Sequence, residues 1–441
     1  MKALPVLDER ATGIDVGSES LHVSIAGGSP KVFGTMTRDL EALVVWLKAE
    51  GVRSVAVEAT GVYWLCLYEA LEAAGIEVLV VNGRHVRNLP GRKTDMADCQ
   101  WLATLHAHGL LRSGFVPPAD IRRLQDYLRL RQDHITMGAS HVQHMQKALE
   151  RMNVKFHDVI SSLTGVSGLS VIRAILSGER NPQILLGLCD VQIQKRKAER
   201  VRESLRGTWK AEHLFALRQA LSGWEFYQVQ IRECDQAIEQ VLHDLGVSKD
   251  ADPGSPVKPG GVNTPQIDGL HHMLVQLCGG KDATQLPGMA DYSLLQVIGE
   301  VGTDLTKWPS EKHFTAWSGL APAARQSGKR RSREARHCNR TGQLFCSMAR
   351  SLANSVDKSL GGFYRRLKAR RGGLVANKAL ARKLAALFWQ VMVHGVAYVE
   401  QGLKKYEARV ALTEQRVLAK LAHKHGLQLL PKNNDLARVP G

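Results

Sequence analysis

Four acidic residues near the start of the chain have a spacing that suits a metal-binding phosphodiester site. Asp15 lies inside a short apolar run, Glu58 ends a second one, and Asp95 and Asp98 are three positions apart. Acids at i and i+3 share one face of a helix, and an acid on a strand points away from its apolar neighbours. Converging carboxylates repel one another unless cations neutralise them, and hard oxygen ligands favour Mg²⁺ or Mn²⁺. Two such ions can clamp the attacking and leaving oxygens of a phosphoryl transfer.

Taken one at a time, these acids also have ordinary structural explanations. Asp15 could be a turn residue before Gly17, Glu58 a solvated strand end, and Asp95 a helix N-cap. Residues 15–18 also fit the first phosphate loop of an actin-like or sugar-kinase ATPase. The sequence shows no second phosphate loop and no glycine-rich adenosine site, so the four acids together favour the metal-binding interpretation.

The first part of the chain alternates β-branched runs with helical periodicity, which predicts a mixed sheet covered by helices. Strands are expected at 12–16, 20–26, 31–36, 54–58 and 77–81, and helices at 39–50, 63–74 and 95–108. In this order the fourth strand lies beside the first, which brings Glu58 next to Asp15. The predicted fold of residues 1–118 is α/β and ribonuclease-H-like, or RuvC-like.

An all-α region with long polar helices is expected at 119–250. Two sets of apolar residues fall there on heptad a and d positions. The first set is Leu124, Leu128, Ile135, Val142, Met145, Leu149 and Met152, and the second is Leu214, Leu217, Leu221, Trp224, Ile231, Ile238, Leu242 and Leu245. Arg131 and Gly138 interrupt the first seam, and Gln228 and Asp235 interrupt the second. The seams predict a coiled coil or helical hairpin that serves oligomerisation, with an ordinary helical domain as the alternative.

A linker and a further helical domain are expected to follow. Residues 251–265 are rich in Pro and Gly, which is typical of a linker. The C-terminal domain is assigned to 266–441. Its Leu-Pro-Gly-Met turn at 286–289 precedes an apolar helix at 294–298 and resembles a helix-hairpin-helix turn, in which backbone amides meet a DNA phosphate.

The composition favours a polyanionic partner. The 441 residues include 59 Lys and Arg against 42 Asp and Glu, a formal net charge of +17, which points to nucleic acid. The longest apolar stretch, 384–399, is interrupted by polar residues and is shorter than the ~20 residues that span a membrane. The seven cysteines contain no CxxC pair, so we expect neither a disulfide framework nor a zinc site, and a reducing cytoplasm fits best.

Three groups of basic residues could contact a nucleic-acid backbone. The first precedes the paired acids and comprises Arg84, Arg87, Arg92 and Lys93. The second surrounds two serines and comprises Arg325, Lys329, Arg330, Arg331 and Arg333. The third alternates with aromatic residues and comprises Arg365, Arg366, Arg370 and Arg371. A solvated charged surface is the plain alternative for each group.

The two serines of the second group are Ser327 and Ser332. A serine hydroxyl is a weak nucleophile near neutral pH, but metal ions and arginines around a phosphate polarise the phosphorus and ease deprotonation of the hydroxyl. The residues alone therefore allow a nucleophilic serine, and they equally allow a solvated basic loop with incidental serines.

Several motifs in fixed order resemble the DEDD transposases of the insertion sequence 110 group. They lie at residues 13–17, 57–63, 93–98, 286–289, 314–322, 326–328 and 363–367. The resemblance spans both ends of the chain and is weakest in its middle, which is longer than in compact members and fits a subgroup with an enlarged coiled coil.

The resemblance implies an RNA-guided DNA transposase or recombinase of the bacterial cytoplasm, nucleoid-associated when it acts. It implies that Asp15, Glu58, Asp95 and Asp98 bind Mg²⁺ and that Ser327 becomes covalently linked to DNA. It also implies double-stranded donor and target DNA as partners, a structured bridge RNA that pairs with both, and a homo-oligomer, dimer to tetramer, with a composite active site. Lys329 and residues 336–342 depart from the family pattern, which leaves Ser332 as a competing nucleophile.

Two other functions remain compatible with the same residues. A RuvC-like hydrolytic nuclease or junction resolvase would use the acids and water without a covalent step. A non-catalytic nucleic-acid-binding protein would need only the basic groups.

Overall fold

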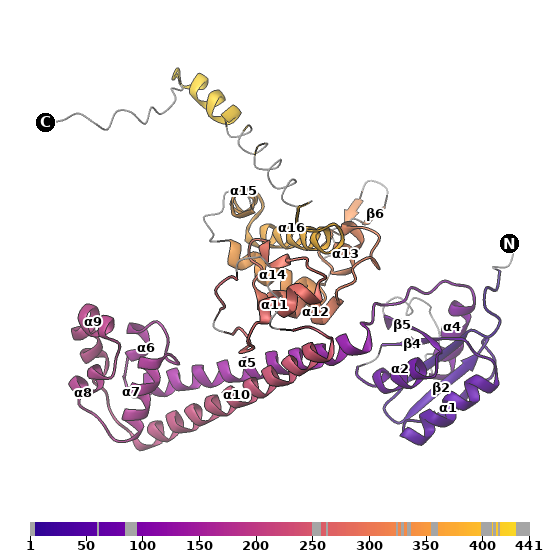
Figure 1. Ribbon diagram of the computed structural model, residues 1–441, viewed down its shortest axis with the longest axis horizontal. Helices are drawn as coiled ribbons and strands as arrows, with labels where there is room; N and C mark the ends of the chain where they lie inside the picture. Colours follow the sequence, from indigo (N-terminus) through magenta and orange to yellow (C-terminus); the bar gives the residue numbers. More distant parts are fainter. Residues whose placement is uncertain are drawn as a thin grey trace. The chain divides into compact units, whose positions relative to one another are not determined.

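The computed structural model describes most of the chain, in two compact units, Met1–Val116 and Pro117–Gly441 (Figure 1). The described residues are 5–59, 61–83, 95–248, 257–261, 263–322, 325–327, 330–332, 337–353, 360–397, 408, 412 and 415–428. For 325–327 and 330–332 only the backbone is described.

The first unit contains a five-stranded mixed sheet in the order β3-β2-β1-β4-β5. The strands are β1 (Thr12–Val16), β2 (Ser20–Ile25), β3 (Lys31–Gly34), β4 (Ser54–Glu58) and β5 (Glu77–Val81). β1, β2 and β3 form an antiparallel meander, whereas β4 runs parallel to β1 and β5 parallel to β4. The mixed α/β architecture is confirmed, and its strand order is compatible with the expected ribonuclease-H-like fold.

The expected strands and helices of this unit are present, with ends that shift by one or two residues. Its helices are α1 (Thr37–Ala49), α2 (Trp64–Ala73) and α4 (Asp95–Ala107). The third strand ends before the expected Met36 because Met36 caps α1: its backbone N–H donates to Asp39 Oδ2 at 3.2 Å. The chain therefore leaves the sheet early and enters the helix at Thr37.

Helices cover both faces of the sheet. Leu43 of α1 and Leu67 of α2 are fully or almost fully buried against a cluster that includes Ile14 and Val57. Ala56, which neighbours Val57 on β4, belongs instead to a cluster with Leu102 of α4. Because side chains alternate along a strand, α1 and α2 lie on one face and α4 lies on the other.

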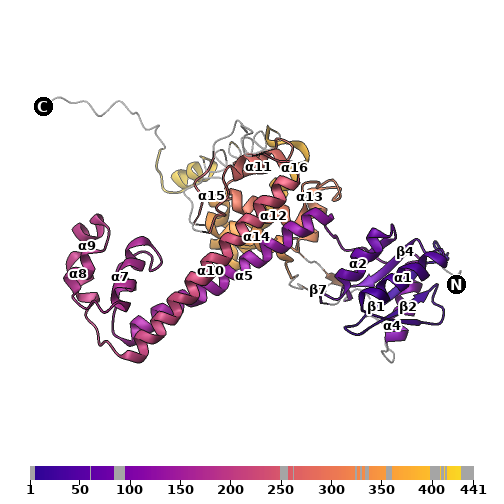
Figure 2. The same ribbon diagram turned by 60° about the horizontal axis from the view of Figure 1, so that its bottom comes forward.

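Two long helices dominate the second unit: α5 (Ala119–Arg151) and α10 (Ala211–Asp244) lie side by side (Figure 1 and Figure 2). They are antiparallel, since Arg123 meets Asp244 near one end and Arg131 meets Asp235 further along. Arg131 Nε donates to Asp235 Oδ1 at 2.6 Å, and both side chains are almost completely buried. Two of the residues that interrupt the apolar seams, one from each seam, are thus each other's partner.

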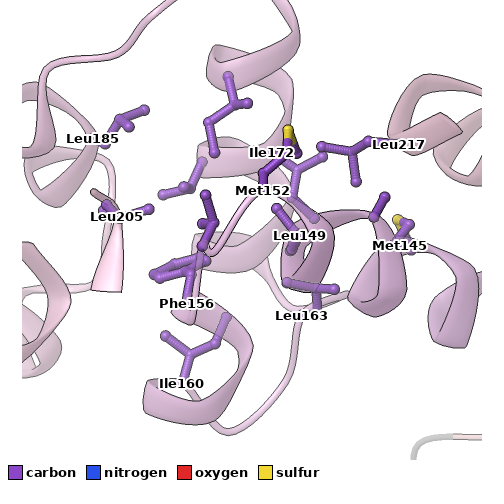
Figure 3. Packing of buried hydrophobic residues seen from close by; sticks show 14 of the residues in the cluster. Met145, Leu149, Met152, Phe156, Ile160, Leu163, Ile172, Leu185, Leu205 and Leu217 are labelled. Carbon is purple, nitrogen blue, oxygen red and sulfur yellow. The ribbon is translucent and has the colours of Figure 1, made fainter. Parts of the chain in front are cut away.

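A small helical cluster closes the far end of the pair. It consists of α6 (Phe156–Val159), α7 (Val166–Leu176), α8 (Pro182–Gly187) and α9 (Val191–Ser204). Leu149 and Leu217 from the long helices pack there with Phe156, Ile172 and Leu205, all of which are fully buried (Figure 3). Burial of this apolar surface holds the connection between α5 and α10 in place.

Where the structure describes it, the remainder of the second unit is mainly helical and contains one short hairpin. Its elements are α11 (Leu270–Leu277), η1 (Ala283–Gln285), α12 (Asp291–Val301), α13 (Glu311–Trp317), β6 (Arg325–Ser327), β7 (Arg330–Ser332), α14 (Arg340–Leu352), α15 (Leu360–Arg371) and α16 (Gly373–His394). Its core is aromatic: Phe314, Phe345 and Phe388 are fully buried and lie 5.7 to 6.2 Å apart between ring centroids. Within the described residues, no helix is both long and apolar enough to cross a bilayer.

This aromatic domain docks on α5 through polar contacts. Glu300 of α12 accepts two hydrogen bonds from Arg129, at 3.1 and 2.8 Å, and pairs with Arg340 at 3.2 Å. Gln125 donates to the backbone oxygen of Gly299 at 3.1 Å. The N-terminal part of α5 and the α12–α14 region are therefore joined within one unit.

Candidate functional site

The sheet brings Asp15 and Glu58 to the same edge. β1 and β4 are parallel neighbours, and Ile14 lies opposite Val57. Asp15 and Glu58 are the next residues on the two strands, so they lie side by side at the carboxyl ends. This placement agrees with the strand order expected from the sequence. Carboxyl ends of adjacent parallel strands are a common place for ligand-binding side chains in α/β sheets.

Helix α4 brings the other two acids to Asp15 because Gly13 lets it approach. A Cβ at Gly13 would lie 2.3 Å from the backbone oxygen of Cys99, which is shorter than any real contact. Gly13 and Asp15 share one face of β1, so the helix that covers Gly13 also covers the edge beside Asp15. Asp95 and Asp98 stand in the first turn of this helix.

Electrostatics show that the four acids form one group. Burial, and after it the charges of Asp95, Asp98 and Glu58 in that order of size, together raise the pKa of Asp15 from 3.8 to about 6, while His22 opposes the shift. Like charges in a partly buried site disfavour ionisation. The sequence-predicted acids are therefore brought together, at the price of mutual repulsion.

His22 is a member of this site that the sequence reasoning missed. It lies directly opposite Asp15 in the antiparallel β1–β2 pair. One ligand atom each from Asp15, His22 and Asp95 lies within 4.8 Å of the others. The signal was available in the sequence: a tight turn at 17–19 between two strands sets a register that places position 22 opposite position 15.

The donor set fits a divalent cation. Carboxylate oxygens suit Mg²⁺ and Mn²⁺, and the imidazole nitrogen adds affinity for softer ions such as Mn²⁺. A second acid and histidine group, Glu150 with His157 and Asp158, has similar spacing. There Lys155 already forms an ion pair with Glu150, so the protein itself balances part of the negative charge of that group.

The basic residues predicted before α4 cannot be placed. Arg84, Arg87, Arg92 and Lys93 lie outside the described residues.

The two candidate serines lie on a short hairpin in the second unit. Ser327 on β6 is paired with Arg330 on β7, and Ser332 is paired with Arg325 at the other end of the ladder. Ser327 therefore borders the turn, whereas Ser332 stands away from it. Only the backbone of Arg331 is described, and Lys329 and Arg333 lie outside the described residues.

Helix α15 carries the third basic group. Arg365, Arg370 and Arg371 are exposed and Arg366 is partly buried. The helix contains no acidic residue, so its positive charge is not neutralised along its own length. Such a surface suits contact with phosphates.

The Leu-Pro-Gly-Met turn is anchored by a residue of the predicted linker. Lys258 Nζ donates to the backbone oxygens of Leu286 at 3.1 Å and Met289 at 3.4 Å, and also to that of Thr284. Burial lowers the pKa of Lys258. This part of the linker is thus fixed to the turn, and the turn leads directly into α12 at Asp291.

Comparison with known families agrees with the position of these features. Residues 12–154 match a transposase model of the DEDD, IS110 type, and residues 281–365 match a model described as transposase, IS116/IS110/IS902 family. The four acids fall in the first range and both serines in the second. No curated protein matches the chain.

Proposed function

Because the chain belongs to the IS116/IS110/IS902 family of transposases, whose two models together match just over half of it, we propose that it cleaves and rejoins DNA through a phosphoserine intermediate. The observation that carries the proposal is the convergence of four carboxylates and His22 at one edge of a mixed sheet. The family makes the protein a DNA-recombining enzyme; the covalent step, the ions and the RNA guide are our proposals.

Asp15, Glu58, Asp95 and Asp98 would hold the divalent ions, most simply two Mg²⁺, with Mn²⁺ as a substitute. When bound, the ions supply positive charge to the reacting phosphate. The raised pKa of Asp15 supports this assignment, because a bound cation would offset the burial and the like-charge repulsion that raise it. The acids orient the scissile phosphate by fixing where that charge sits.

Ser327 would perform the covalent step. Its Oγ forms a bond to the scissile phosphorus, the bond from phosphorus to the 3′ oxygen breaks, and the serine proton ends on the released 3′-hydroxyl. A 3′-hydroxyl of the partner DNA then attacks the phosphoserine, which restores the phosphodiester and the serine. We prefer Ser327 to Ser332 because Ser327 borders the hairpin turn.

The basic surfaces support nucleic-acid partners. The exposed cations of α15 would bind backbone phosphates of donor and target DNA or of a structured guide RNA. Guidance by a bridge RNA rests on the family resemblance, and the acid-free helix supplies a surface suited to it.

Assembly through the α5–α10 pair is also proposed, as an extended coiled coil between copies of the chain. Exposed apolar side chains on the pair support it: Leu130 and Met137 on α5, and Phe226 and Val229 on α10, are 42 to 55% exposed. Exposed apolar patches of this kind mark interaction sites. A dimer or tetramer would let acids of one protomer act with Ser327 of another.

A hydrolytic nuclease is the second candidate, because the acids form a complete group within the first unit alone. The experiment that tests the proposed function compares Asp15→Ala and Glu58→Ala with the unmodified protein in metal-dependent DNA cleavage and in DNA binding. We expect cleavage to be lost and binding to be largely kept. Cleavage that persists in both variants would remove the acids from the chemistry and favour a binding protein.

A further inference from the structure

A cavity of about 710 Å³ lies in the second unit, and neither the four acids nor the two candidate serines are among the described residues that line it. It is bounded by α5, α12, α14, the end of the linker and the Leu-Pro-Gly-Met turn. Its volume falls in the range of roughly 300 to 1,000 Å³ that is typical of small-ligand pockets. Nothing in the proposed transposase chemistry uses it.

The lining mixes polar and apolar side chains and carries no charge. Among the described residues that line it, the polar side chains are amides and hydroxyls, including Gln132, Gln296, Asn263, Thr264 and Ser347, and none is acidic or basic. In a chain with a formal charge of +17, a neutral lining selects against a phosphate inside the cavity. It suits a neutral ligand rich in hydrogen-bonding groups, such as a base with its sugar.

One wall of the cavity is held in a fixed arrangement. Gln132 Oε1 accepts hydrogen bonds from Gln296 Nε2 at 3.3 Å and from Tyr292 Oη at 3.4 Å. The guanidinium of Arg131, itself paired with Asp235, lies 4.7 Å from the centre of the Tyr292 ring. These bonds leave Gln132 Nε2 as a donor and Gln296 Oε1 as an acceptor for a ligand. A neighbouring donor and acceptor match the edge of adenine, the base that Gln and Asn side chains read.

The rim offers a place for the phosphate that the interior disfavours. Gly288 of the turn and Ala290, the residue before α12, both border the cavity. Ala290 supplies no side-chain cap to α12, and the acid of the first turn, Asp291, lies 2.7 Å from His271 Nδ1. Backbone N–H groups at an uncapped helix start are available to a phosphate. The rim and the interior together therefore suit the two ends of one nucleotide.

We propose that this cavity, here called the amide cavity, receives one unpaired adenine nucleotide of a single-stranded RNA. The base would meet Gln132 and Gln296, and the sugar 2′-hydroxyl would meet hydroxyls such as those of Thr264 and Ser347. Unpaired bases that leave the stack are the usual target of specific RNA recognition, and the 2′-hydroxyl distinguishes RNA from DNA. The inference rests on the proposed function, since it assigns an RNA contact to the transposase.

The test uses the full chain and a short single-stranded RNA of uridines with one central adenosine and a fluorescent dye on its 5′ end. Binding is followed by fluorescence anisotropy, with the equally labelled all-uridine RNA and the deoxy version of the probe in parallel. Ser347→Trp fills the cavity and Gln296→Ala removes one reading group. We expect both to weaken binding of the probe about tenfold, as for loss of a base-reading amide.

Gln343→Trp is the matched control, because Gln343 is exposed on the same helix one turn earlier and does not line the cavity. Thermal unfolding identifies any variant that fails to fold. If one fails, Gln132→Ala is measured in its place. Unchanged probe binding in folded Ser347→Trp and Gln296→Ala would overturn the inference. Equal binding of the deoxy probe would overturn the assignment to RNA. Metal-dependent DNA cleavage by the unmodified protein is measured alongside; its absence would count against the proposed function, whatever the cavity binds.

Discussion

Asp15 and His22 face each other across the β1–β2 pair, and a carboxylate oxygen of Asp95 comes within 4.8 Å of both ligand atoms. With His22, the proposed metal site offers a nitrogen atom beside its carboxylate oxygens. Nitrogen ligands raise affinity for Mn²⁺ more than for Mg²⁺, so His22 bears on the choice of ion.

We predict that His22→Ala lowers affinity for Mn²⁺ by at least roughly tenfold, the scale of losses at metal sites, and lowers affinity for Mg²⁺ less. Isothermal titration calorimetry with each ion measures both. His108→Ala serves as the control, since His108 is only partly buried, contacts the backbone oxygen of Pro5 and belongs to neither acid and histidine group found among the described residues. Equal losses for the two ions would show that His22 acts on the fold of the site and not as a ligand.

The raised pKa of Asp15 predicts a pH dependence with a definite sign. Its pKa is about 6 in the folded, metal-free protein against an ordinary 3.8, so the folded state holds the proton more tightly. The stabilising contribution of protonated Asp15 is complete below pH 3.8 and is lost as pH rises through about 6. Metal binding must displace this proton, so metal affinity should increase up to about pH 6 and then level off.

Thermal unfolding in a chelator, compared between the unmodified protein and Asp15→Asn, isolates this contribution. The melting temperature of the unmodified protein, relative to that of Asp15→Asn, should fall as pH rises from 3.8 through about 6. A constant difference from low to neutral pH would contradict the raised pKa.

Gly13→Ala should separate α4 from β1. The added Cβ would meet the backbone of Cys99 and Ala103 at 2.3 and 2.4 Å, and backbone cannot rotate away as a side chain can. We expect a loss of about 1 to 3 kcal/mol or more in the free energy of unfolding, together with weaker metal binding because Asp95 and Asp98 move with the helix. Denaturant unfolding and calorimetry measure the two effects.

Gly187→Ala is the matched control for this substitution. A Cβ at Gly187 meets nothing within 4 Å, and alanine is favoured over glycine in a helix by about 0.5 to 1 kcal/mol. Its stability should stay level or rise. If Gly13→Ala behaves in the same way, the close approach of α4 is not what holds the acids together.

The buried pair of Arg131 and Asp235 gives a prediction about the long helices. Arg131→Met leaves Asp235 buried without its partner and should cost about 3 to 5 kcal/mol of stability. Adding Asp235→Leu should recover much of that loss, because two apolar side chains then face each other on the seam. A double-mutant cycle in denaturant measures the coupling, and additive losses in the double variant would contradict a direct pair.

The sequence was enough to predict the strands of the sheet and the grouping of the four acids. The first follows from local periodicity, and the second from strand order and the spacing of the carboxylates. Strand alternation alone placed the Asp15 side chain on the other face of β1 from its apolar neighbours. Strand order placed Glu58 beside it. The pairing of Arg131 with Asp235 was not predictable, since each was visible only as a break in its own seam. Likewise, the sequence indicated only that Lys258 belongs to a linker. Its three backbone carbonyl partners lie 26 to 31 residues further along the chain, so local patterns could not predict these contacts.

The amide cavity lay beyond sequence reasoning for a similar reason. Gln132 and Gln296 are far apart in the chain and come together only where α12 docks on α5. Local patterns mark residue types and faces, but not which faces of distant helices meet.

The most direct test of the central claim is covalent trapping of DNA on the protein. The full chain is incubated with labelled element-end DNA, the guide RNA and Mg²⁺, then denatured and separated by gel electrophoresis. We predict a DNA-linked protein band that is present in Ser332→Ala, absent in Ser327→Ala, and absent in Asp15→Ala. DNA cleavage that continues undiminished in Ser327→Ala, without any linked band, would contradict the account and identify water as the nucleophile.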